Sequence, residues 1–407
     1  MAELLYGNLT FYDRFAGILR QEPDSRFAFQ YDEAYLATGR PAIAYTLPLQ
    51  SDPIYNSSGL HAFFDNLVAE GWLANAQARA LGIGSDDRFA RLLAFGHDCV
   101  GAASILDPRP RIQPNLDAGS PEEIAALANR ASISGVQPKL LVVKTNNGYR
   151  PAGPSEASTH IAKLPSGSLP GIVELEYLTM TAAAELLRPD AIAEIEVAPV
   201  AGLPGRCLIV RRFDRLEDGS KVHFEEFNQL LNHSSEAKYD GAYSDMAAFL
   251  RGNPRCQVAD ADLLLRRVLA CILLGNNDAH MKNFGLLYAG SAMRLAPVYD
   301  FLAVSLYPDY DSTLALRMGV GTNPGRLSAI SGKNVEALAK SFGYGRGALL
   351  QAVHDLGARL EGAVDAVLEA PHGSSMQKTN LAEYMRKRWN GTFSLIGNSI
   401  GSLIGKR

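Results

Sequence analysis

The stretch LGNNDAHMKNFGLL, residues 274–287, decides the fold because it holds an aspartate and an asparagine at a spacing with a defined chemical use. Asp278 and Asn283 are five positions apart, as in the D-x-x-x-x-N loop of phosphotransfer enzymes. In that loop the aspartate accepts the proton of a hydroxyl acceptor, and the asparagine holds a magnesium ion on the phosphates. Taken alone, the pair is explained equally well by an ordinary Asn-Asn-Asp turn.

A second carboxylate follows in LAPVYDFLAV, residues 295–304, where Asp300 interrupts an apolar run. Burying an isolated carboxylate is costly unless it is paired or binds a cation, so this position suits a metal ligand. Asp300-Phe301-Leu302 also resembles the Asp-Phe-Gly magnesium motif, with leucine in place of glycine. The alternative is a turn aspartate that caps a helix.

Two charged residues upstream match the nucleotide-binding pattern of the same enzymes. Lys163 lies in the strand-like run HIAKL, residues 160–164, comparable to the strand lysine that pairs with nucleotide phosphates. Glu176 is expected in the first turn of a helix over ELEYLTMTAAAELL, residues 174–187, where it could orient Lys163. A surface lysine and a glutamate that merely favours the helix dipole are the alternatives.

The segment SISGVQPKLLVV, residues 132–143, suits a loop whose backbone N–H groups face phosphate, because small polar residues and one glycine precede a strand-like run. It lacks the spacing G-x-G-x-x-G, so a plain loop entering a strand is the alternative. His280 follows Asp278 by two residues and could contact phosphate, although a hydrogen-bonded structural role explains it as well.

Composition indicates an ordinary globular protein of more than one folding unit. The chain has 407 residues, of which 47% are hydrophobic and 20% charged, with a net charge of −4, so bulk charge argues against a strongly basic nucleic-acid binder. The four cysteines lack Cys-x-x-Cys spacing, which argues against a zinc site and a disulfide framework. Neither an export signal nor a membrane helix is expected, and we expect a cytoplasmic protein.

Periodicity predicts strands first and helices later. Alternation over 27–31 and the run 42–47 predict strands, whereas residues 60–73 and 86–96 show helical spacing. The Pro-rich stretch 107–120 is the expected linker. Further strands are predicted at 140–144, 160–164 and 207–213, and helices at 246–252, 261–275, 334–343 and 348–370. We have no physical account of the apolar, glycine-broken tail at 391–407.

In combination these segments resemble the HipA-like kinase family over roughly residues 5–370. The landmarks occur in order along the chain: FFDNLVAEGW from Phe63, GHDCVGA from Gly96, SISGVQPK from Ser132, HIAKLP from His160, VRRFDR from Val210, NDAHMKNF from Asn277 and PVYDFLAVSLYP from Pro297. The resemblance implies an α+β, protein-kinase-like fold in two lobes. We expect an N-terminal α/β subdomain at 1–108, a nucleotide-binding lobe at 121–245 and a mostly helical lobe at 246–407, with the nucleotide between the lobes.

The resemblance also implies roles for individual residues. Asp278 would be the catalytic base, and Asn283 and Asp300 would ligate Mg²⁺. Autophosphorylation at Ser132 or Ser134 would switch the enzyme off. ATP would be the cofactor, held by Ser134, Gly135, Val136, Gln137, Lys139, Lys163, Arg211, Phe213, His280 and Lys282.

One position departs from the family pattern. Arg211 stands where the hinge of the best-known relative begins with an acidic residue, so a side-chain contact to the adenine amino group would be lost. Backbone contacts to adenine between Arg211 and Phe213 could persist. The departure bears on nucleotide preference rather than on catalysis.

The resemblance further implies the biology of a serine/threonine kinase toxin linked to growth arrest and persistence. Such a toxin commonly phosphorylates an aminoacyl-tRNA synthetase, is held in check by a small helix-turn-helix antitoxin of the HipB type, and reaches DNA only through that partner. No membrane partner is expected. Two alternatives stay open: a phosphotransferase acting on a small-molecule or lipid hydroxyl, and a catalytically silent scaffold that binds an antitoxin.

Overall fold

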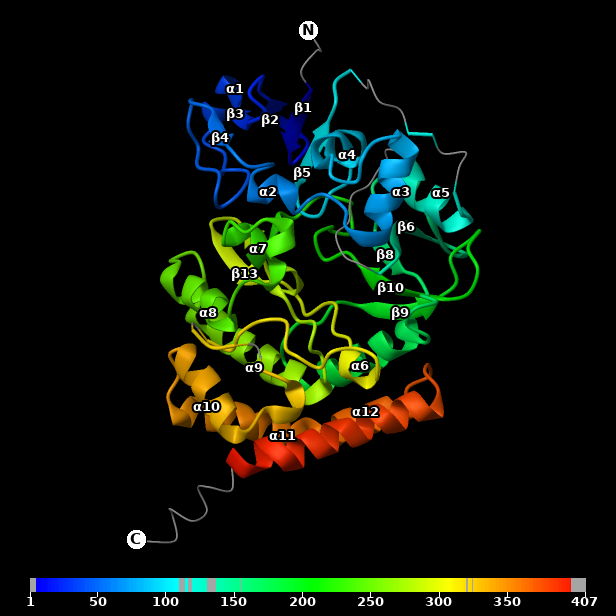
Figure 1. Cartoon of the computed structure of the whole chain (residues 1–407), viewed down its shortest axis with the longest axis vertical. Coiled ribbons are helices and arrows are strands. Elements are labelled where there is room, and N and C mark those ends of the chain that lie inside the picture. The colour runs from blue at the N-terminus through cyan, green and yellow to red at the C-terminus, as the bar shows by residue number, and fades with distance from the viewer. Residues whose placement is uncertain are drawn as a thin grey trace. The chain divides into compact units, whose positions relative to one another are not determined.

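The computed structural model describes residues 5–109, 114–115, 119–129, 137–154, 156–319, 321–323 and 325–396. The chain forms two compact units, and each combines two separate stretches of sequence (Figure 1). The first unit takes the chain up to Ser166 and again from Ala198 to Ala237. The second unit takes Gly167–Val197 and the chain from Lys238 onward. The mixed α+β class is confirmed, and the chain crosses between the units three times.

The first unit opens with an antiparallel sheet in the strand order β4-β3-β2-β1-β5. The predicted strand at 27–31 is confirmed as β3, whose Phe29 and Tyr31 are buried in the core of this sheet. The strands are β1 (Tyr6–Phe11), β2 (Arg14–Gln21), β3 (Phe27–Tyr31), β4 (Ile54–Asn56) and β5 (Ala103–Leu106).

The predicted strand at 42–47 is wrong. Within it Ala44 and Leu47 form only an isolated bridge. The hydroxyl of Tyr31 accepts from the Ile43 N–H at 3.0 Å and donates to the Leu47 carbonyl at 2.7 Å. A buried side chain from β3 therefore satisfies the backbone groups that a strand partner would otherwise satisfy.

The helix expected over 60–73 is broken into two, whereas the one expected at 86–96 is confirmed. Asn66 ends the first piece, and its side-chain amide donates to the Ala62 carbonyl at 2.8 Å. Gly71, with φ of 56°, begins the second piece. The helices here are α1 (Glu33–Leu36), α2 (Ala62–Asp65), α3 (Gly71–Leu81) and α4 (Arg88–Phe95).

A second sheet of the first unit contains β7, β6, β8 and β10 in that order. All three strands predicted in this region are confirmed, as β6, β8 and β10. The predicted linker 107–120 falls largely outside the described residues. The elements of this part of the first unit are α5 (Pro121–Ala128), β6 (Lys139–Thr145), β7 (Gly148–Pro151), β8 (His160–Lys163), β10 (Cys207–Arg211), β11 (Phe224–Glu226) and α7 (Phe227–Leu230). Strand β9 (Ile195–Ala198) belongs to the second unit except for Ala198.

The second unit is mostly helical, as predicted for the C-terminal part. Helix α6 packs against α9 and the long helix α11, and α12 packs along α11 (Figure 1). Strands β12 (Gly285–Ala289) and β13 (Ala292–Leu295) form an antiparallel hairpin. The helices are α6 (Ile172–Leu186), α8 (Tyr243–Gly252), α9 (Val258–Leu274), α10 (Gly332–Ser341), α11 (Arg346–Glu369) and α12 (Ser375–Arg388).

The predicted domain division stays a prediction. Helix α6 was expected among the strands of a sheet-based lobe, but it belongs to the compact helical unit. Of the apolar C-terminal tail, residues 391–396 are described, and the first three of them end a π-helical turn at Trp389–Phe393. No helix among the described residues is long and apolar enough to cross a membrane.

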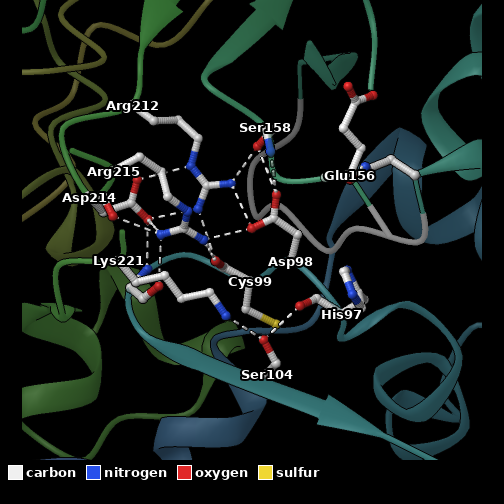
Figure 2. A network of polar contacts seen from close by, with 12 residues as sticks. His97, Asp98, Cys99, Ser104, Glu156, Ser158, Arg212, Asp214, Arg215 and Lys221 are labelled. Carbon is white, nitrogen blue, oxygen red and sulfur yellow. Dashed lines mark hydrogen bonds and ion pairs between the residues drawn. The ribbon is translucent and has the colours of Figure 1, made fainter. Parts of the chain in front are cut away.

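A buried network of two arginines and two aspartates lies within the first unit (Figure 2). Arg212 binds Asp214 with two hydrogen bonds of 2.9 and 2.7 Å. Arg215 donates to Asp98 at 2.6 Å and to Asp214 at 3.0 Å. Each of the four residues is at most 6% exposed, so the two positive and two negative charges neutralise one another in a region shielded from water.

The network joins two segments that are far apart in sequence. The guanidinium groups of Arg212 and Arg215 also donate to the Cys99 carbonyl, at 2.9 and 3.0 Å. Burial alone would raise the pKa of Asp98, but these two guanidinium groups hold it well below its ordinary value. GHDCVGA and VRRFDR therefore meet in the fold, and the network holds the loop before β5 against the end of β10.

We expect Asp98→Asn to lower the free energy of unfolding by ~3–5 kcal/mol, because two buried guanidinium groups would be left with one carboxylate. Urea unfolding at pH 7 measures the loss. The matched control is Asp13→Asn, which removes the exposed carboxylate that pairs with Lys221 at 3.1 Å and is expected to cost less than ~1 kcal/mol. Equal losses in both variants would show that the buried network is not special.

Candidate active site

The candidate catalytic loop follows the buried C-terminal part of helix α9. From Leu264 to Leu274 the apolar residues of α9 are 0% exposed. The helix ends at Gly275 in the left-handed conformation, with φ of 79°. A side chain there would lie 2.2 Å from the Ser305 hydroxyl oxygen, so glycine is required both by conformation and by space.

Backbone and amide hydrogen bonds hold the loop on both sides of Asp278. The Asn277 side chain donates to the carbonyls of Asp311 and Thr313 at 2.7 and 3.2 Å. The Asp278 carbonyl accepts from the His280 N–H at 2.8 Å. His280 is buried, and its Nδ1 accepts from the Lys282 N–H at 3.3 Å, which supports the structural role foreseen for this histidine.

Asp278 carries a carboxyl with an altered acidity. Part of the side chain is exposed, but the chain packed around the rest of it raises its pKa to about 6 through desolvation. The nearby charge of Asp300 adds to the rise, whereas Lys238 and a 3.0 Å hydrogen bond from the Tyr239 hydroxyl act against it. A carboxylate with this pKa is mostly ionised at pH 7 and is a stronger base than an ordinary aspartate.

The structure brings Asn283 and Asp300 together. The Asn283 side-chain nitrogen donates to Asp300 Oδ2 at 2.6 Å, and its oxygen accepts from the His280 N–H at 2.9 Å. Asp300 has φ of 60°, a left-handed conformation that costs an ordinary residue energy and that aspartate tolerates better than most. The backbone at Asp300 is thus held in a shape that aims its carboxylate at the loop of Asp278 and Asn283.

These two side chains suit a hard divalent cation after one rearrangement. Mg²⁺ takes oxygen ligands, and the Asp300 carboxylate supplies them directly. The Asn283 amide, however, faces Asp300 with its nitrogen, so it must turn over to offer its oxygen. Among the described residues there is no cluster of three or more histidine, cysteine or acidic side chains that could bind a metal alone. A cation here would therefore need further oxygen ligands from water or a phosphate.

In the first unit the two predicted phosphate-binding lysines stand opposite each other. Lys139 on β6 and Lys163 on β8 are register partners, so their side chains share one face of the sheet. They are 8% and 6% exposed. The sequence predicted both residues as nucleotide contacts, and the structure shows that they are direct neighbours.

The other predicted nucleotide contacts are only partly described. The Gln137 side chain donates to the Leu164 carbonyl at 3.0 Å. Arg211 pairs with Glu217 at 3.5 Å, and the Phe213 ring packs edge-on against Phe224 at 5.3 Å between centroids. Ser132, Ser134, Gly135 and Val136 lie outside the described residues.

Glu176 lies one turn later in its helix than expected. Helix α6 begins at Ile172, preceded by Gly171 in the left-handed conformation, so the first turn contains Glu174 instead. Ile172 and Val173 are buried and extend the helix toward its N-terminus. Glu176 is 1% exposed, and its proposed role of orienting a lysine stays a prediction.

Two residues were missed from the sequence alone: Tyr239, which contacts Asp278, and Asn277, which precedes it in the chain. Tyr239 lies 39 residues before Asp278, and its hydroxyl reaches the carboxylate through the fold alone. Asn277 could have been suspected from its place in the Asn-Asn-Asp cluster. No local pattern marks Tyr239.

Comparisons with known proteins agree over nearly the whole chain. The model of the HipA-like C-terminal domain matches residues 131–365, and the model of the HipA N-terminal domain matches residues 8–106. The chain is similar to Y4mE of Sinorhizobium fredii, with 29% identity over 89% of this chain and 91% of that protein. It is also similar to the serine/threonine-protein kinase toxin HipA of Shewanella oneidensis, with 26% identity over 84% of each.

A solved structure shares the fold. It is the Shewanella oneidensis MR-1 toxin–antitoxin complex of HipA, HipB and operator DNA, of which one chain matches with a TM-score of 0.76 and 22% identity. The match covers 96% of this chain and 99% of that chain. The predicted HipA-like fold is confirmed.

We expect the Asp278 carboxyl to titrate near pH 6 in the metal-free protein, because desolvation raises its pKa from the ordinary 3.8. The measurement is a pH series of NMR spectra on protein labelled at aspartate carboxyl carbons, with Asp278→Asn to identify the signal. A titration midpoint near 4 for that signal would contradict the desolvated environment.

Proposed function

The chain belongs to the HipA-like family, and from this premise we propose that it is an ATP-dependent serine/threonine protein kinase that acts as the toxin of a toxin–antitoxin pair. The observation that carries the proposal is the arrangement of one loop. It presents the desolvated carboxylate of Asp278 and, five residues on, Asn283 hydrogen-bonded to Asp300. Phosphoryl transfer needs such a base and such oxygen ligands, and little other covalent chemistry from the protein.

In this proposal Asp278 accepts the proton of the acceptor hydroxyl. The acceptor oxygen bonds to the γ-phosphorus while the bond from that phosphorus to the bridging oxygen breaks and ADP leaves. Asn283 and Asp300 would hold Mg²⁺, which would neutralise charge on the phosphates when bound. The raised pKa of Asp278 keeps the carboxylate ionised yet basic enough at neutral pH.

The remaining roles concern the nucleotide. Lys139 and Lys163 supply two positive charges on one face of the sheet, which suits the phosphates of ATP. Glu176 orients Lys163, and Arg211 to Phe213 provide backbone contacts for adenine. Residues 132–139 cover the phosphates, and phosphorylation of Ser132 or Ser134 would add negative charge there and switch the enzyme off. His280 and Lys282 complete the proposed set of contacts.

The proposed partners follow from the relatives. The solved relative is a complex of HipA with HipB and operator DNA, which supports a small HipB-like helix-turn-helix antitoxin as the partner of this chain. DNA would be reached through that antitoxin. The proposed substrate is a protein of translation such as an aminoacyl-tRNA synthetase.

We expect Asp278→Asn to lower phosphate transfer by about 10²–10⁴-fold, the usual contribution of a general base. The substitution keeps the size of the side chain, so the fold should be retained. Mass spectrometry of the purified, dephosphorylated protein after incubation with Mg²⁺ and ATP measures incorporated phosphate. Asp262→Asn on α9, whose carboxylate pairs with Arg266 at 2.8 Å, is the control and should leave transfer unchanged. Equal transfer by Asp278→Asn and wild type would remove Asp278 from the mechanism.

We expect Lys163→Met to weaken ATP binding by about 10–100-fold, because a charged hydrogen bond contributes ~1.5–3 kcal/mol. Lys144→Met serves as the control, since Lys144 lies on the same sheet but is exposed and stacks on Tyr149 at 5.6 Å. Isothermal titration calorimetry with Mg²⁺ and a non-hydrolysable ATP analogue gives both dissociation constants. Unchanged affinity in Lys163→Met would place the phosphates elsewhere.

A further inference from the structure

Tyr239 is the residue of the second unit whose hydroxyl reaches the proposed catalytic base. It ends the short turn Ser235–Tyr239, one residue after the chain enters that unit at Lys238. Its hydroxyl donates to Asp278 Oδ1 at 3.0 Å. Its ring contacts His280 edge-on at 5.2 Å, and Lys238 Nζ lies 5.4 Å from the ring centroid.

The geometry of this hydrogen bond is that of an acceptor hydroxyl about to lose its proton. A general base must lie about 2.6–3.2 Å from the hydroxyl oxygen that it deprotonates. The Tyr239 hydroxyl meets that condition, and it donates to the carboxylate oxygen as an acceptor would. An incoming hydroxyl that approaches the same oxygen meets Tyr239 first.

The other carboxylate oxygen offers no equivalent route. The hydrogen bond from Tyr239 stabilises the ionised form and lowers the pKa of Asp278, so an acceptor that used the second oxygen would face a weaker base. Tyr239 is also 44% exposed, which leaves its side chain room to turn toward solvent. Displacement of the Tyr239 hydroxyl would therefore give the acceptor a stronger base, and the exposed side chain has room to move.

We propose that Tyr239, with Lys238 and His280 beside it, lies in the acceptor subsite. Its hydroxyl occupies the position on Asp278 that the acceptor hydroxyl takes during the reaction, until a hydroxyl-bearing polypeptide segment or water displaces it. The inference rests on the proposed kinase function. In the step that follows, the acceptor's proton passes to Asp278 while the acceptor oxygen bonds to the γ-phosphorus. The bond from that phosphorus to the bridging oxygen breaks, and ADP leaves.

The test compares the initial rate of ADP formation by wild type and Tyr239→Phe at saturating Mg²⁺ and ATP. The measurement is made at pH 8, where Asp278 is ionised in both proteins. Phenylalanine keeps the ring contacts and removes only the hydroxyl. The control is Tyr310→Phe, which removes a hydroxyl from a similarly exposed tyrosine of the same unit, 47% against 44%. ADP formation counts transfer to every acceptor, including water.

We expect Tyr239→Phe to form ADP about two- to tenfold faster, the range of ~0.5–1.5 kcal/mol for one hydrogen bond, with KM for ATP unchanged. Tyr310→Phe should match wild type. Phosphate found on Tyr239 itself in wild type would also support the inference, because it would place that hydroxyl in line for transfer. A rate that is unchanged or lower in Tyr239→Phe overturns it, since the tyrosine would then be neutral or would orient the base.

The two proposals fail in different ways. ADP formation by wild type that is lost in Asp278→Asn, together with a slower Tyr239→Phe, leaves the kinase assignment standing and removes the acceptor subsite. No ADP formation by wild type removes both. Equal thermal unfolding midpoints for wild type and Tyr239→Phe ensure that a rate change does not report a damaged fold.

Discussion

The candidate site depends on a helix that cannot move. From Leu264 to Leu274 every apolar residue of helix α9 is fully buried, so a shift of this part along its axis would disturb the residues packed against it. Inside that unit Arg267 on α9 binds Asp190 with two hydrogen bonds of 2.7 Å and also donates to the Ala296 carbonyl at 2.7 Å. The same helix therefore fixes both the loop that follows it and the segment that leads to Asp300.

The left-handed turns at Gly275 and Asp300 set the direction of the catalytic loop and of the Asp300 carboxylate relative to this helix. The first ends α9 and sends the chain into the loop of Asp278, and the second turns the Asp300 carboxylate toward Asn283. One turn needs glycine because neighbouring side chains leave no space, whereas the other accepts aspartate at some cost in backbone energy. Strain of this kind persists where the surrounding structure determines it fully.

Much of the fold was predictable because its helices and its strands follow simple periodicities. The pattern at 261–275 predicts α9, and the run at 207–213 predicts β10. The failures have local physical causes: the Tyr31 hydroxyl replaces a strand partner near residues 43–47, and Asn66 and Gly71 interrupt a helix. At the site, the five-residue spacing in the sequence was enough to identify Asp278 and Asn283 as candidate residues. The Tyr239 contact and the meeting of Asp98 with Arg215 arise from tertiary structure and leave no trace in a local pattern.

The interleaving of the two units affects how the chain must fold as it is synthesised. Helix α6 leaves the ribosome about 160 residues before its partner α11, which corresponds to roughly 10–30 s of translation. During that time the face of α6 that packs against α11 has no native partner, although α9 is made earlier. Asp98 is likewise made long before its partner Arg215. The first unit is complete only once the chain has reached Ala237, and the second unit needs the chain from Lys238 onward. The nascent chain therefore presents apolar helix surface before α11 has been made, and all residues of the candidate site are present only once Asp300 has been added.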